Sequence, residues 1–302
     1  MWLIFALATT LIWGLAELFY KKGSHPDEKY GHLKVCVCVG IVMGIHAVFT
    51  LLTQDIGYSF ASLVRYLPVS LCYIVSMAFS FFGVRFIEES ISDPIENTSG
   101  GIVCLMCALL LKESIPPLAA VAVILILIGI VGIGSFERRG KTDRSKKLGK
   151  RMAIIAFAMP FCYAILDALG TFLDIYYLDI STSPLVGVTE ETIENVANTS
   201  YELTFAICAL IILAFLKIRG VEFELPKQRD KILAAICETG GQFTYVFAMS
   251  GNGAIAAPII SSVCVVSLLL SRIVLKEKLT SGQYFFITMV ITGIILLGTM
   301  DA

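Results

Sequence analysis

Seven carboxylates lie within or beside long apolar segments of the chain: Glu17, Asp93, Glu96, Asp167, Asp174, Glu202 and Glu238. An ionisable side chain at the centre of a membrane helix costs at least about 2.5–3.5 kcal/mol, so each needs a chemical reason. Basic side chains at this depth are nearly absent, because Arg65, Arg85 and Arg272 lie near segment ends and can extend outwards. The sequence predicts an acidic interior that attracts a cation, takes up protons, or does both.

Glu17 is the first candidate for binding a cation. It follows Trp13 by four residues, so both side chains share one helical face. A carboxylate beside an indole suits an ammonium group, because cation–π attraction adds about 0.5–2 kcal/mol to the ionic attraction. Tyr163 and Asp167 repeat this pattern and are expected to supply the facing half of the cage. The alternative is structural: Trp13 packs, and Glu17 bonds to a neighbouring helix.

A second polar stripe combines Glu238 with Gln242 and Tyr245, four and seven residues further along. This spacing places the three side chains on one helical face. Gly240 and Gly241 beside them leave room for a ligand or for a closely packed helix. We predict that the stripe contributes to substrate binding.

Glu96 and Asn97 form a third candidate group. They follow Pro94 and precede Gly100 and Gly101, in the polar first half of an apolar segment. Proline and glycine interrupt a membrane helix only where protein or water satisfies the freed backbone groups. Glu96 and Asn97 are therefore expected to face a cavity, whereas Asp93 is expected to cap the helix near the membrane surface.

Two further polar groups are expected to play other roles. Asn195, Asn198 and Glu202 recur on one face, where bonding between helices is at least as good an explanation as substrate contact. His46 stands alone in its segment and is a candidate for proton transfer. The proton-coupling candidates are Glu17, Glu238 and His46.

The composition is that of a membrane protein. The chain is 57% hydrophobic, has a mean hydropathy of +0.84 and is only 16% charged, against about 25% in soluble domains. Ten segments approach the roughly 20 apolar residues that a membrane helix needs: 2–20, 33–53, 66–87, 92–111, 117–135, 152–177, 195–217, 231–250, 254–275 and 282–300. The nine cysteines all fall in these segments. They indicate neither a disulfide framework nor a metal site, and we expect no metal and no other cofactor.

The distribution of basic residues predicts the orientation. The loops after the odd-numbered spans and the adjoining span ends hold 21 of the 23 lysines and arginines, and the opposite loops hold only Arg65 and Lys112. Cytoplasmic loops carry such an excess, so we predict a multi-pass plasma-membrane protein with both termini outside. The basic segment 137–151 is then a cytoplasmic connector, and nucleic acid is not expected as a partner.

An internal repeat predicts two halves. Residues 91–135 and 255–299 align without a gap, and Pro94, Leu111-Lys112-Glu113 and Gly129 fall on Pro258, Leu275-Lys276-Glu277 and Gly293. Each half has five spans, so the second half enters the membrane from the other side. The expected fold class is all-α, with ten membrane helices in two inverted five-helix repeats around a central cavity. The halves are 1–135 and 152–302, joined by the connector 136–151.

These features resemble the EamA-type branch of the drug/metabolite transporter superfamily. The residues that carry the resemblance are Trp13-Gly14 in the first span and the Leu-Lys-Glu triplets that close spans 4 and 9. It implies alternating access around a cavity lined by spans 1, 3, 4, 6, 8 and 9, and a small metabolite, amino acid, amine or drug as cargo. It also implies cytoplasmic termini, the reverse of the charge prediction. Glu17 is similar in placement to the functional first-span glutamate of the small multidrug branch.

We therefore expect a secondary transporter of a small organic cation or zwitterion, coupled to protons or another gradient. The alternatives are a permease for a neutral sugar or nucleoside, and a passive channel. An intramembrane enzyme is not expected, because neither Tyr-Asp nor Gly-x-Gly-Asp occurs in any span and the sequence lacks H-E-x-x-H and G-x-S-x-G. The sequence also lacks G-x-x-x-x-G-K-[ST], so we expect an ion or substrate gradient as the driving force. The expected partners are the lipid bilayer and the substrate, and the expected assembly is a monomer or homodimer.

Overall fold

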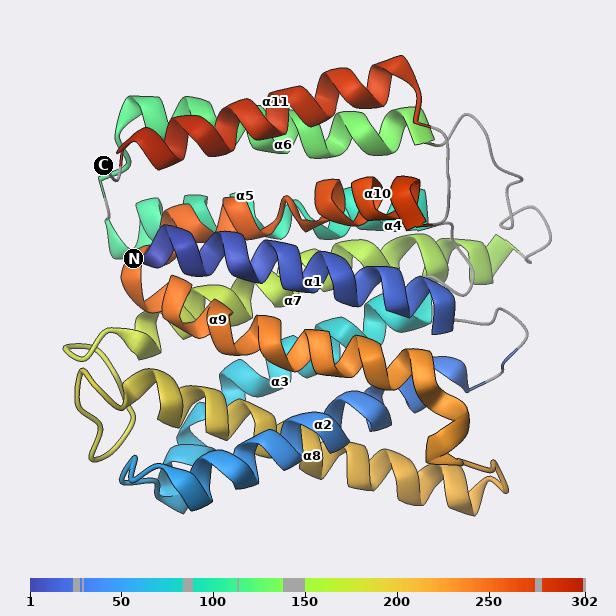
Figure 1. Cartoon of the computed structure of the whole chain (residues 1–302). Helices are drawn as coiled ribbons and strands as arrows, with labels where there is room; N and C mark the ends of the chain where they lie inside the picture. The colour runs from blue at the N-terminus through green and yellow to red at the C-terminus, as the bar shows by residue number, and fades with distance from the viewer. Residues whose placement is uncertain are drawn as a thin grey trace.

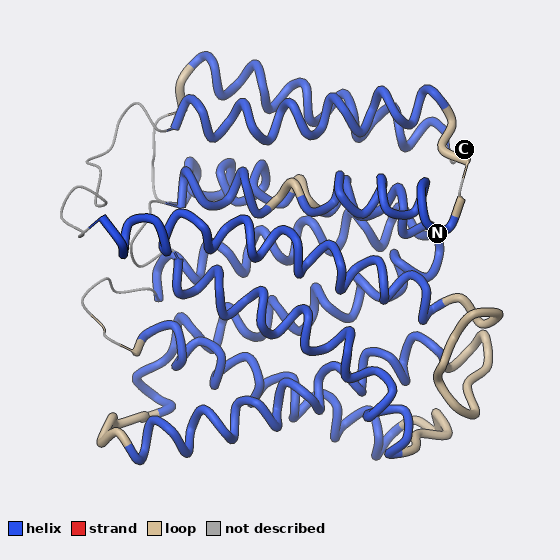
Figure 2. The backbone as a smooth tube through the Cα atoms, turned by 180° about the vertical axis from the view of Figure 1, so that it is seen from behind, coloured by secondary structure: helices blue, strands red, loops and turns tan. Residues whose placement is uncertain are grey.

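The fold is a bundle of long helices (Figures 1 and 2). The computed structural model describes residues 1–23, 28, 30–83, 89–112, 114–137, 150–274 and 279–300, and within them the regular structure is helical. The helices are α1 (Trp2–Gly23), α2 (Gly31–Thr53), α3 (Phe60–Gly83), α4 (Glu89–Glu96), α5 (Ser99–Met106), η1 (Cys107–Leu111), α6 (Pro117–Glu137), α7 (Lys150–Leu178), α8 (Ile193–Ile218), η3 (Leu225–Gln228), α9 (Arg229–Ile260), α10 (Val263–Val274) and α11 (Ser281–Met300).

Nine helical stretches of the described residues are long and apolar enough to cross a membrane. They correspond to nine of the ten predicted spans. The tenth, 254–275, is divided between the end of α9 and the shorter helix α10. The predicted all-α membrane fold is confirmed. The Leu-Lys-Glu triplet at 275–277 and most of the connector 136–151 lie outside the described residues, and the predicted halves remain a prediction.

The helices pack as neighbouring pairs that combine the two halves of the sequence. Helices α6 and α11 lie together at one edge of the bundle, and α2 and α8 at the opposite edge (Figure 1). Between them, α1 packs against α9 and α3 against α7, with the short helices α4, α5 and α10 alongside. Both chain termini lie at the same end (Figure 1). Which end faces the cytoplasm stays a prediction.

Two spans break at equivalent positions of the repeat. Helix α4 ends at Glu96 and α5 begins at Ser99, whereas α9 ends at Ile260 and α10 begins at Val263. The two turns, at 97–98 and 261–262, are separated by the same 164 positions as the repeated segments. They also meet, because the Gly100 amide donates to Ser261 Oγ at 3.1 Å. The backbone amide of Gly100, just after the first break, is therefore satisfied by a side chain from the second, as a broken membrane helix requires.

The repeated glycines Gly129 and Gly293 allow α6 and α11 to pack closely. A Cβ on Gly129 would meet Val290 and lie 3.0 Å from the Phe286 carbonyl oxygen, and one on Gly293 would lie 2.8 Å from the Ala122 carbonyl oxygen. Each glycine thus lets one backbone approach the other, as small residues do at membrane helix interfaces. Two copies related by a twofold axis would make such reciprocal contacts. The inversion itself stays a prediction.

An ion network connects Glu28 to Lys34 on α2 and to Lys231 near the start of α9. Glu28 accepts from Lys34 Nζ at 2.7 Å and from Lys231 Nζ at 2.8 Å, and Lys231 also donates to Gln228 Oε1 at 2.8 Å. Partial burial tends to raise the pKa of Glu28, but the hydrogen bonds from Lys231 and Lys34 outweigh it, and the pKa lies below its ordinary value. Lys231 is only 5% exposed, so the network is shielded from solvent.

Glu28→Gln is expected to destabilise the protein by about 1.5–3 kcal/mol at neutral pH, because it weakens hydrogen bonds to a buried charge. Since folding lowers the pKa of Glu28, its contribution is present above the ordinary pKa of about 4.3 and is lost as the pH falls further. Thermal unfolding in detergent should give the variant a lower melting temperature than the wild type at pH 7. The two melting temperatures should become equal as the pH falls below the pKa of Glu28. The matched control is Glu224→Gln, which removes the exposed ion pair with Lys227 and should change little. Equal melting temperatures of wild type and Glu28→Gln at pH 7 would contradict this account.

Candidate functional site

A cavity of about 200 Å³ lies between the helices of the two halves. All nine residues predicted to bind substrate lie in its wall: Trp13, Glu17, Glu96, Asn97, Tyr163, Asp167, Glu238, Gln242 and Tyr245. They come from α1, α4, α7 and α9 and from the turn after α4. The structure therefore brings three separately predicted groups into one site, whereas their role in binding stays a prediction.

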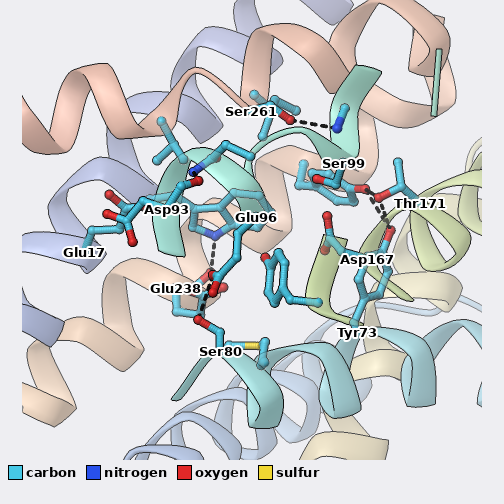
Figure 3. Close-up of a pocket in the computed structure, with 18 of the residues that line it drawn as sticks. Glu17, Tyr73, Ser80, Asp93, Glu96, Ser99, Asp167, Thr171, Glu238 and Ser261 are labelled. Carbon is cyan, nitrogen blue, oxygen red and sulfur yellow. Dashed lines mark hydrogen bonds between the residues drawn. The ribbon is translucent and has the colours of Figure 1, made fainter. Parts of the chain in front are cut away.

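The cavity wall is strongly acidic. Its five carboxylates are those of Glu17, Asp93, Glu96, Asp167 and Glu238. Among the described residues that line the cavity, Lys21 is the one with a basic side chain. Glu17 lies beside Asp93, and Asp167 lies across the pocket from them, with Glu96 and Glu238 between (Figure 3). Like charges held this close in a membrane need a counter-charge or protons. The wall is built to receive positive charge.

Hydroxyl groups hold the inner carboxylates in place. Ser80 Oγ on α3 donates to Glu96 Oε2 at 2.8 Å, and Ser92 Oγ donates to Glu96 Oε1 at 2.5 Å. Tyr20 on α1 donates to Glu238 Oε2 at 3.4 Å. Glu96 is only 8% exposed. Among the described residues, its hydrogen bonds come from two serine hydroxyls and not from a basic side chain.

Aromatic rings form the other part of the wall. The rings of Trp13 and Tyr245 lie 5.2 Å apart, and Tyr73 contacts both Tyr245 and Tyr201 edge to face, at 6.1 and 5.8 Å. Trp13 Nε1 donates to the Glu238 carbonyl oxygen at 3.2 Å. The sequence places Tyr163 opposite Trp13 in the cage, but the ring that packs on Trp13 is that of Tyr245. Rings and carboxylates together are the components of an organic-cation site.

A set of hydroxyl bonds closes one end of the cavity. The hydroxyls of Tyr73 and Tyr245 lie 2.7 Å apart, and both donate to Thr171 Oγ1, at 3.2 and 2.9 Å. We call Tyr73, Thr171 and Tyr245 the hydroxyl barrier; all three are buried. Lys21 and Asp93, towards the other end, are partly exposed. The described wall is therefore closed on the side of the chain termini.

Comparison with known proteins agrees with this architecture. Residues 181–299 match the model of the EamA-like transporter family. The second half of the chain is thus similar to EamA-like transporters. A protein of known crystal structure covers 98% of this chain and 96% of its own length with a TM-score of 0.71, at 12% sequence identity, which shows a shared fold. No curated protein sequence matches the chain. The predicted resemblance is confirmed.

Gly241 accommodates Trp13. A Cβ on Gly241 would lie 2.5 Å from Trp13 Nε1 and 3.0 Å from its Cγ, whereas a Cβ on Gly240 would meet only Ile12, at 3.7 Å. Of the two explanations for the glycine pair, close helix packing is therefore the one that the structure supports. Gly241 lets the indole reach the cavity wall from α1.

Gly241→Ala is expected to displace the indole and weaken the binding of a cationic ligand by about 2- to 30-fold, which corresponds to a cation–π term of about 0.5–2 kcal/mol. Gly240→Ala is the matched control, because its methyl group makes an ordinary contact. Ligand titrations of the two purified variants measure the difference. Equal affinities would show that the position of Trp13 does not matter for binding.

His46 lies away from the cavity, at the interface of α2 and α8. Its Nδ1 is 2.8 and 2.9 Å from the two carboxylate oxygens of Glu202, which also accepts from Asn198 Nδ2 at 3.0 Å. The structure thus supports the expectation that Asn198 and Glu202 make structural contacts. His46 is not among the residues of the wall, and a role in proton coupling stays a prediction.

Several residues of the site were not predicted from the sequence: Tyr20, Tyr73, Ser80, Thr171 and Tyr201. Thr171 follows Asp167 by four residues on α7, so its helical spacing indicated a shared face. Tyr20 likewise follows Glu17 by three residues on α1, whereas Tyr73, Ser80 and Tyr201 have no carboxylate three or four residues away. Asp93, expected as a cap near the membrane surface, instead lies within α4 and lines the cavity.

Proposed function

We propose that this transporter moves a small organic cation or zwitterion across the membrane by alternating access, in exchange for protons. The observation that carries the proposal is the placement of five carboxylates in the wall of one cavity. A buried carboxylate is retained where it meets a counter-charge or binds a proton. An ammonium group supplies the first and protonation supplies the second, so substrate and proton compete for the same acids.

Recognition would combine two kinds of contact. The ammonium group would lie among Glu17, Glu96 and Glu238, where the ionic attraction is shielded from water. The rings of Trp13 and Tyr245 would stack on its alkyl groups and face its positive charge. A neutral sugar or nucleoside would leave several carboxylates without a counter-charge, which makes this alternative the weaker one.

The exchange of substrate for protons follows from the same wall. Protonation of Glu17 or Glu238 would remove the negative charge that holds the cation and would favour its release. The hydroxyl barrier closes the side of the termini in this conformation, and the opposite end has the partly exposed residues. In alternating access, a second conformation would break this barrier and close the other end.

A ligand-induced thermal shift screen on the purified protein tests the proposed substrate class. Primary amines, quaternary ammonium compounds and amino acids are compared with sugars and nucleosides of similar size. Amines should raise the melting temperature in proportion to the logarithm of their concentration, because only the folded protein binds them. Stabilisation by sugars or nucleosides and not by any amine or amino acid would support a neutral permease instead.

A further inference from the structure

Asp174 has a buried carboxyl group that is not part of the cavity wall. It lies on α7, seven residues after Asp167, which is two helical turns or about 10.5 Å along the axis. Thr171, a member of the hydroxyl barrier, stands between these two acids on the same face. Asp174 is 0% exposed and is not among the residues that line the cavity. Because it follows Thr171 towards the end of α7 at Leu178, it lies behind the barrier, on the side of the chain termini.

The contacts of Asp174 leave half of its carboxyl group unsatisfied. Oδ1 accepts a hydrogen bond from the Tyr66 hydroxyl, whereas Oδ2 is buried and has no hydrogen-bond partner among the described residues. The Tyr73 hydroxyl of the barrier lies next to the same carboxyl group. Asp174 is thus adjacent to the chain of hydroxyls whose other members line the cavity.

No described cation balances a charge at this position. The titratable groups that face Asp174 are Tyr66 and Tyr73 from α3, Tyr245 from α9 and Asp167 from its own helix. Arg65, adjacent to Tyr66 in the chain, donates instead to the Pro184 carbonyl oxygen at 2.6 Å. An isolated buried carboxylate is unfavourable enough that the group takes up a proton instead. The neutral form of Asp174 fits these surroundings.

We propose that Asp174 is a proton-binding site of the transport cycle, separate from the cation-binding carboxylates of the cavity. The proton arrives through the hydroxyls of Tyr245 and Tyr73, which lie 2.7 Å apart. Tyr245 accepts a proton from the cavity and donates its own to Tyr73, and Tyr73 donates its own to the Asp174 carboxyl group, so both tyrosines end neutral and the proton ends on Asp174. When the barrier opens, water from the side of the termini reaches Asp174 and takes the proton away. This inference deepens the proposed function and rests on it for the transport test.

The first test uses proteoliposomes and the Asp174→Asn variant. With one proton exchanged per monovalent cation, a gradient of one pH unit supports at most about tenfold accumulation of substrate. Asp174→Asn should lower this accumulation to what proton competition at Glu17 and Glu238 alone supports, and should keep the exchange of labelled for unlabelled cation at equal pH. The matched control is Asp55→Asn, an exposed loop residue, which should keep both. Accumulation by Asp174→Asn at the wild-type level, or loss of exchange together with accumulation, would overturn the proposal.

The second test requires no transport. Infrared spectra of the purified protein at neutral pH should contain the C=O stretch of a protonated carboxyl group, and the difference between wild type and Asp174→Asn should show one such band lost. Asp55→Asn should show no such loss. If Asp174→Asn removes a carboxylate band instead, Asp174 is ionised and the proposal is wrong. If the wild-type protein transports no cation, the proposed function is wrong. The infrared result still decides whether Asp174 is protonated.

Discussion

Replacing Glu17 with Gln is expected to reduce transport of an organic cation by about 100-fold or more. Loss of one partner of a buried charge pair costs about 2–5 kcal/mol, and every 1.4 kcal/mol is tenfold. Gln keeps the size of the side chain and its capacity for hydrogen bonds, so the loss reports on charge. Trp13 lines the same cavity one helical turn away, and its ring alone cannot replace the carboxylate.

The control for this variant is Glu190→Gln, the same change at an exposed loop position. It should transport at the wild-type rate. Initial uptake rates in proteoliposomes, corrected for the amount of reconstituted protein, give the comparison. Full activity of Glu17→Gln would remove Glu17 from the mechanism and leave the remaining acids of the cavity as the candidates.

Replacing Gly100 with Ala is expected to destabilise the protein by about 1–3 kcal/mol, as overpacking does, and to abolish transport. A Cβ at this position would lie 2.6 Å from the Ala257 carbonyl oxygen and 2.9 Å from its carbon, both of which are backbone atoms. Gly100, Ala257 and Ser261 all line the cavity. The methyl group would therefore push apart the two broken spans where they form the site.

The adjacent glycine supplies the matched control. A Cβ on Gly101 would meet the end of the Leu127 side chain, which can change its conformation, so Gly101→Ala should unfold at nearly the wild-type temperature. Thermal unfolding and uptake are measured for both variants. Wild-type stability and uptake of Gly100→Ala would show that the close crossing of the two broken spans is not required.

Local spacing was sufficient to predict much of the candidate site. Trp13 with Glu17, and Glu238 with Gln242 and Tyr245, each share a helical face, and a carboxylate in an apolar segment is rare enough to stand out. Both properties can be read within one helix. For this reason nine residues predicted from separate segments lie in one cavity wall.

Contacts between helices could not be predicted in the same way. The pairing of Trp13 with Tyr245 rather than Tyr163 depends on how α1 crosses α9, which Gly241 permits. Tyr73 and Tyr201 resemble any aromatic residue of a membrane helix until Tyr245 is placed beside Tyr73. The break at 261–262 was not predicted either, because two serines in an apolar segment bond to helix carbonyls as readily as they end a helix.

Uptake of a labelled organic cation into proteoliposomes under an imposed pH gradient tests the central claim most directly. The account predicts that the cation accumulates above its concentration in the medium, that a protonophore abolishes the accumulation, and that unlabelled amines compete whereas sugars do not. Equilibration without accumulation would indicate a passive channel. Uptake of a neutral sugar or nucleoside in place of any cation or zwitterion would contradict the account.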